Sequence, residues 1–182
     1  GIVHSWAGRR FLAWGRPGGF HIDGGGASVQ QGAFELTASA GRPVTTELES
    51  PLGGQAGFAH ATYAHGLRAG YSLPGELAAG VAFFQQWAYG VEADRVLAAD
   101  LFWRPHRRLD LTAGAVLDTL QLGVEQASLR ATYFVLDPLD VEVSYIHQDP
   151  QRLLPSWSIL SVFATGLFDE VGAAATWRSR WQ

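Results

Sequence analysis

Acidic and basic side chains recur at alternate positions along several extended stretches of this sequence. In one stretch, Asp94, Asp100 and Arg104 occupy even-numbered positions, while Leu97 and Leu101 occupy odd-numbered positions. Facing acidic and basic side chains can hold a transverse electric field across a water-filled passage and select solutes by charge. Alternatively, they neutralise one another inside a packed interior. Ten candidate residues share this character: Glu92, Asp94, Asp100, Arg104, Asp110, Asp118, Arg130, Glu142, Arg178 and Arg180.

Other residue types that commonly perform chemistry are poorly arranged for it. His60 and His65 are five positions apart, so in a strand they face opposite sides and cannot bind one metal ion. Ser144 and His147 also have opposite parity, which disfavours a Ser–His hydrolase. The glycine-rich run at 23–26 lacks the lysine and following helix of a phosphate loop, so we expect a flexible loop or a tight bend. We therefore expect neither an enzyme nor a bound metal or cofactor.

The composition excludes several classes of protein. The chain has 182 residues, a formal net charge of −4 and no cysteine, so disulfides and thiolate chemistry are absent. No Arg-rich or aromatic stripe forms a phosphate-binding surface, which disfavours nucleic acid as a partner. Charged residues make up 16%, below the roughly 25% of average soluble domains, so part of the surface is expected to lie outside water. No stretch reaches the ~18 apolar residues of a spanning helix.

Alternation with a period of two predicts β-strands throughout the chain. Residues 57–182 form regular hairpins with turns expected at 73–76, 105–108, 137–140 and 169–170. Residues 1–56 are less regular, and strands are expected there at 9–16, 27–31 and 34–42. We expect about eleven strands, and several run well beyond the average of about 5 to 6 residues. Their length suits a tilted membrane-spanning strand, which needs about 9 to 11 residues.

The apolar parity of these strands is rich in alanine, which fills a dry core poorly but is acceptable beside lipid. Leu111 and Leu129 are examples of positions expected to face lipid. Aromatic residues collect near the expected strand ends, as in the interfacial girdles of membrane barrels: Trp87, Tyr89, Trp103, Tyr133, Tyr145, Trp157, Trp177 and Trp181. A soluble β-sandwich shows the same alternation with its apolar face inward. The sequence favours the membrane alternative.

The long alternating strands, the turns Leu-Pro-Gly-Glu and Asp-Pro-Leu-Asp, and the segment 13–30 resemble bacterial outer-membrane β-barrels of the porin-like type. The resemblance implies a bacterial outer-membrane location, with the lipid bilayer and small solutes or ions as partners. It implies an all-β antiparallel up-and-down transmembrane β-barrel, a single domain over 1–182 with about 10–12 strands, and passive diffusion.

Two departures from this resemblance leave alternatives open. Such barrels often end on an aromatic residue, whereas this chain ends Trp181-Gln182. The expected odd strand number also conflicts with the even numbers of bacterial single-chain barrels. Either the first third has been miscounted, or the chain is a piece of a larger barrel. A non-conducting structural or adhesive barrel and a soluble ligand-binding β-barrel or sandwich remain alternatives, and the oligomeric state is not indicated.

Overall fold

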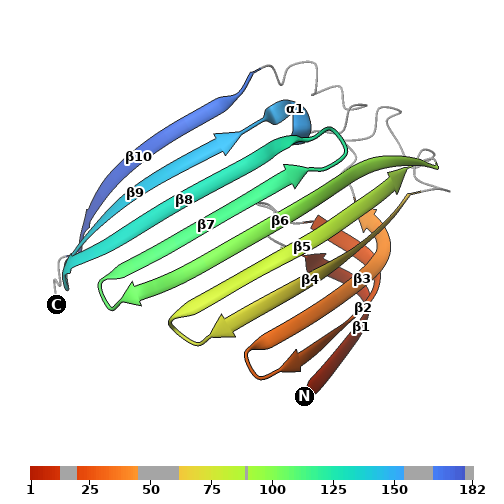
Figure 1. Ribbon diagram of the computed structural model, residues 1–182, viewed down its shortest axis with the longest axis horizontal. Coiled ribbons are helices and arrows are strands. Elements are labelled where there is room, and N and C mark those ends of the chain that lie inside the picture. The colour runs from red at the N-terminus through yellow and green to blue at the C-terminus, as the bar shows by residue number, and fades with distance from the viewer. Residues whose placement is uncertain (13–19, 45–61, 89, 154–165, 179–182) are drawn as a thin grey trace.

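The computed structural model describes residues 1–12, 20–44, 62–88, 90–153 and 166–178. These residues form one antiparallel sheet of ten strands in chain order, with one short helix (Figure 1). The elements are β1 (Ile2–Leu12), β2 (Phe20–Gln31), β3 (Phe34–Val44), β4 (Tyr63–Leu73), β5 (Leu77–Ala88), β6 (Val91–His106), β7 (Leu109–Asp118), β8 (Gly123–Leu136), β9 (Leu139–Gln148), α1 (Pro150–Leu153) and β10 (Phe168–Trp177). The chain is therefore all-β and up-and-down.

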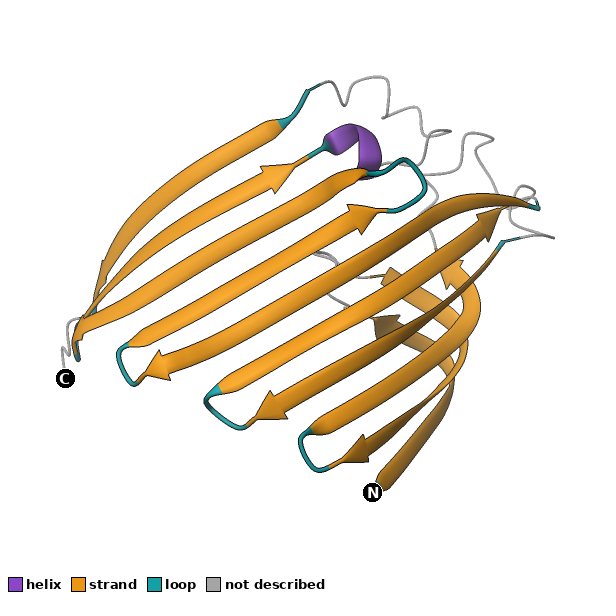
Figure 2. Ribbon diagram, in the orientation of Figure 1, coloured by secondary structure: helices purple, strands orange, loops and turns teal. Residues whose placement is uncertain are grey.

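Short turns gather at one end of the strands, which we call the turn side (Figure 2). Gly32 and Gly75 have φ angles of 59° and 75°, the left-handed conformation that tight turns require and glycine adopts without strain. The opposite end, the loop side, carries α1 and the β7–β8 connection. Because ten is an even number, β1 begins and β10 ends on the turn side.

The sheet curls but does not close into a barrel. Within the described residues, β1 is hydrogen-bonded to β2 alone and β10 to β9 alone, so the two edges remain open. The ten strands fall within the expected number, but the expected ring of hydrogen bonds is missing. A closed barrel requires the two edge strands to pair with each other or with further strands.

Three expected turns differ from the structure. At 105–108 only Arg107 and Arg108 lie between strands, because β6 extends to His106. The third hairpin turn contains only Asp137 and Pro138, because β9 already begins at Leu139. Asp169 and Glu170 do not form a turn. They lie inside β10, where their register partners are His147 and Ile146 of β9. The continuous ladder to β9 overrides the local turn preference of the two acidic residues. The strand expected just before them lies mostly outside the described residues.

The irregular appearance of the first third arises from glycines within strands rather than from loops. The triple glycine expected to form a loop or bend lies inside β2. Gly8, Gly24 and Gly41 are register partners in a row across β1, β2 and β3, which we call the glycine crease. A Cβ at Gly24 would lie 2.2 Å from the carbonyl oxygen of Ala40, a separation that no side chain tolerates. Glycine thus permits the close backbone approach and strong local curl of these strands (Figure 1).

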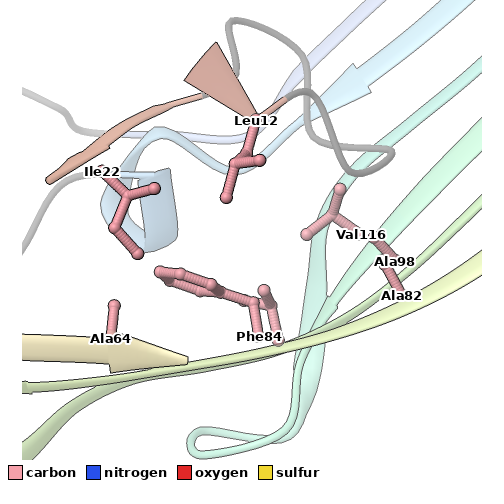
Figure 3. Close-up of a cluster of buried hydrophobic side chains, with 8 residues drawn as sticks. Leu12, Ile22, Ala64, Ala82, Phe84, Ala98 and Val116 are labelled. Carbon is pink, nitrogen blue, oxygen red and sulfur yellow. The ribbon is translucent and has the colours of Figure 1, made fainter. Parts of the chain in front are cut away.

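Burial distinguishes a concave from a convex face in the central strands. In β6, Val96 and Ala98 are buried on the concave face, while Leu97 and Ala99 are exposed on the convex face. Buried apolar side chains gather on the concave face towards the loop side, and we call them the loop-side cluster: Leu12, Ile22, Ala64, Ala82, Phe84, Val96, Ala98 and Val116. Figure 3 shows Leu12 and Ile22 pointing towards Phe84. The curl thus brings the loop-side ends of β1 and β2 over the middle of the sheet.

Candidate functional site

Arginine–carboxylate pairs occupy the concave face between the loop-side cluster and the turn side. Four pairs bridge neighbouring or next-neighbouring strands: Arg68–Asp100, Arg104–Asp110, Arg130–Glu142 and Arg178–Asp140. Six of the eight partners are among the candidates expected from the sequence, which did not single out Arg68 and Asp140. Arg68 follows the same alternation as the others, and Asp140 was expected in a turn. The structure therefore unites most of the candidates on one face as pairs.

The Arg68–Asp100 pair reaches across a whole strand. Arg68 lies on β4 and Asp100 on β6, and the guanidinium Nη1 and Nη2 donate to the two carboxylate oxygens at 2.7 and 2.9 Å. Between them, Gly80 of β5 leaves the space that the guanidinium occupies, since a Cβ there would lie 2.1 Å from Nη1. This two-pronged geometry fixes both orientation and charge position.

Arg104 and Asp110 form a second two-pronged pair beside the β6–β7 turn. The Arg104 Nη2 donates to Asp110 at 2.6 Å, while Nε donates to the other carboxylate oxygen. The guanidinium also lies over the Phe102 ring, 5.6 Å from its centroid. Arg130 and Glu142 are looser, at 3.4 Å, and their side chains remain 59% and 34% exposed. The charges of this pair are therefore accessible to solvent.

Asp118 performs a structural task at the loop side. Its Oδ1 accepts hydrogen bonds from the backbone amides of Leu120 and Gln121, which stabilise the β7–β8 turn. Arg152 of α1 lies 3.5 Å from the other carboxylate oxygen and donates to Asp149 at 2.8 Å. Asp118 is 7% exposed, so it anchors the helix rather than lining an open surface.

Glu92 does not share the face of Asp94, although simple alternation places them together. The register between β5 and β6 shifts beside Trp87, so Glu92 pairs with Trp87 while Asp94 pairs with Gln86. An extra residue in one strand reverses the alternation. Glu92 instead accepts a hydrogen bond from Gln85 at 2.6 Å and lies 3.6 Å from Arg95. Arg180 lies outside the described residues.

The convex face is apolar over most of its extent. Its large exposed side chains include Leu36, Leu67, Val81, Leu97, Leu129, Val143 and Val171. Among the expected interfacial aromatics, Trp103, Tyr133 and Trp177 are exposed on this face near the turn side. Trp87 and Tyr145 lie nearer the loop side, and Trp87 stacks on Tyr63 at a centroid distance of 6.0 Å. Tyr89, Trp157 and Trp181 lie outside the described residues.

Polar residues limit the apolar surface on the loop side. These residues lie at convex-facing positions of eight strands, and we call them the convex polar row: Arg9, Asp23, Arg42, His65, Gln85, Arg95, His147 and Asp169. Arg9 and Asp23 form an ion pair at 2.7 Å within it. Along β6 the apolar side chains from Trp103 to Leu97 cover roughly 20 Å at about 3.4 Å per residue. The row therefore marks one border of an apolar band.

No protein-family model and no curated protein matches the chain. In the part of the chain that the structure describes, no helix is long and apolar enough to cross a membrane. Across the same residues, no three His, Asp or Glu side chains gather as metal ligands.

Proposed function

We propose that this sheet forms the wall of a bacterial outer-membrane β-barrel that works as a porin-like diffusion channel for small solutes or ions. The observation that carries the proposal is the division of the two faces. Large apolar side chains are exposed on the convex face, whereas paired charges line the concave face. A soluble sheet buries its apolar face, and a membrane barrel exposes it to lipid.

The height of the apolar surface supports the same proposal. Along β6 the apolar band covers roughly 20 Å, and aromatic side chains flank it on the turn side, as in the apolar band and aromatic girdle of a membrane barrel. The convex polar row then lies at the headgroups on the loop side. Trp103, Tyr133 and Trp177 lie at the opposite interface, where amphipathic rings are favoured.

An open edge is not viable in lipid, so β1 and β10 need partners in the membrane. β1 runs from the turn side to the loop side and β10 runs back. Their edges are therefore oriented for antiparallel pairing, either with each other or with additional strands. Both edge strands are exposed along nearly their whole length, as expected for unsatisfied sheet ends.

A non-conducting structural barrel is the second candidate, and the loop-side cluster favours it because buried side chains occupy part of the concavity. The two candidates differ in ion flow. The protein should require detergent for extraction, and after reconstitution into a planar phosphatidylcholine bilayer it should produce discrete conductance steps. Release into detergent-free buffer contradicts both candidates. Stable insertion without conductance, both in the wild type and in variants that disrupt the loop-side cluster, selects the structural barrel.

A further inference from the structure

The loop-side ends of β1, β2 and β3 form a small unit of their own. This unit, which we call the flap, contains residues 9–12, 20–23 and 42–44, beyond the glycine crease. The ladder between β3 and β4 stops at the crease, where Gly41 pairs with Ala64. Within the described residues, the flap strands are hydrogen-bonded to one another and not to β4.

Apolar packing joins the flap to the strands that face it across the concavity. Leu12 and Ile22 are 5% and 1% exposed, and both belong to the loop-side cluster with Phe84 and Val116. Phe84 and Val116 lie on β5 and β7, far from the flap in the sequence. Figure 3 shows the flap side chains approaching Phe84 from the opposite side of the concavity. The contact is therefore a non-covalent latch across the concave face.

The two ends of the concave face consequently differ in chemistry. Towards the turn side, charged pairs such as Arg130–Glu142 are partly exposed and can replace part of an ion's hydration shell. Towards the loop side, the four latch residues Leu12, Ile22, Phe84 and Val116 are apolar and at most 5% exposed. A hydrated ion gains nothing there to offset the loss of its water, so an apolar constriction blocks it even when it is not fully filled.

We infer that the flap is a gate: the latch of Leu12 and Ile22 on Phe84 and Val116 is an apolar constriction that excludes hydrated ions and polar solutes. Opening requires the flap to turn about the glycine crease. Two structural properties favour this motion. The crease contains Gly8 with φ +116° and two glycines in backbone contact, and no described ladder ties the flap to β4. The inference rests on the proposed channel function.

The chain contains no cysteine, so the gate can be tested with introduced thiols. In reconstituted bilayers, Ile22→Ser should raise the mean conductance several-fold, because the smaller, polar side chain allows water to enter the latch. In the Ile22→Cys/Phe84→Cys variant, a short reducible thiol cross-linker should abolish conductance, and reductant should restore it in the same membrane. The control is Ser72→Cys/Ala78→Cys, a register pair on the concave face near the turn side, whose cross-linking should leave conductance unchanged.

The outcomes distinguish failure of the gate from failure of the channel function on which it rests. If wild-type protein conducts and neither the serine variant nor the cross-link changes the current, the gate is wrong and the channel stands. If neither wild type nor Ile22→Ser conducts, although the Ile22→Cys/Phe84→Cys pair still cross-links, the channel itself is wrong and the gate falls with it. Reversal by reductant in one membrane excludes misfolding as the explanation for the lost current.

Discussion

Arg68 and Asp100 are joined across an intervening strand, with the guanidinium lying in the space that Gly80 leaves open. Neither partner is adjacent to the other in the sheet, since β5 separates their strands. The pair therefore ties three strands together through side chains as well as through backbone ladders. It also fixes a charge pair at mid-height on the concave face.

Replacing Gly80 with alanine should displace the Arg68 guanidinium, because the new Cβ occupies its position. We expect a loss of about 1 kcal/mol in the free energy of unfolding, typical of the net contribution of one intramolecular hydrogen bond. Denaturant titration in lipid vesicles measures it. In an Arg68→Ala background the same substitution should cost close to nothing. Equal costs in both backgrounds would show that Gly80 matters for another reason.

Leu129→Arg should impair insertion into vesicles, because Leu129 is exposed in the middle of the convex apolar band. A charged residue near the bilayer midplane costs about 2–4 kcal/mol in membrane barrels. Flotation of the refolded protein with phosphatidylcholine vesicles checks this prediction. The matched control is Thr132→Arg, which lies opposite Asp110 and Glu142 on the concave face and should insert normally. Normal flotation of both variants would argue against lipid on the convex face.

Asp110→Ala and Arg130→Ala should change ion selectivity in opposite directions. Asp110→Ala leaves the positive charge of Arg104 without its partner, so it should favour anions. Arg130→Ala leaves the negative charge of Glu142 without its partner, so it should favour cations. The reversal potential across a potassium chloride gradient gives the sign directly. Both variants should fold normally, since their pairs lie at the accessible concave face. A shift of the same sign in both would exclude these pairs as part of the conducting surface.

Tryptophan fluorescence should distinguish the two faces without any channel measurement. In single-tryptophan variants, Trp103 and Trp177 should be quenched by lipids brominated near the headgroup, because both are exposed at the turn-side interface. Trp6 lies on the concave face over Gly26 and should be insensitive to every brominated lipid. Strong quenching of Trp6 together with protection of Trp103 would reverse the assignment of the faces.

Gly24→Ala should destabilise the sheet by about 2 kcal/mol, since the added Cβ meets backbone atoms of β3 that cannot move aside. Gly70 provides the control, because a Cβ there would have its nearest neighbours at 3.8 and 4.0 Å, an ordinary contact distance. The denaturation midpoint of Gly70→Ala should match that of wild type. Comparable losses at both positions would indicate a general cost of replacing strand glycines rather than a tight crease.

The sequence predicts the middle of the sheet well and its first third poorly, for identifiable reasons. In β8 and β9 the alternation assigns Leu129 and Val143 to one face and Glu142 to the other, as the structure does. In β2 the glycines remove the side chains that create alternation, so a long strand resembles a loop. Glycines in a strand indicate a sharp curl only when the residues that pair with them in the neighbouring strands are known.

Other features depend on information that no local pattern contains. One extra residue beside Trp87 moves Glu92 off the face of Asp94, and nothing in the local composition marks the register shift. Asp169 belongs to β10 because His147 and Tyr145 of β9 provide its partners, at 2.9 and 2.8 Å. The contact of Ile22 with the cluster on β5–β7 arises from the curl of the whole sheet. Such long-range relationships decide which candidate residues meet.

The strand order β1 to β10 follows the chain without a crossover, so each strand pairs only with its neighbours in the sequence. Assembly can therefore proceed by adding one neighbouring strand at a time, which keeps the contact order low. The same order makes the sheet modular. A hairpin gained or lost by duplication or deletion would change the circumference of the wall without rerouting any other strand. In the proposed barrel, the diameter would then change in steps of two strands.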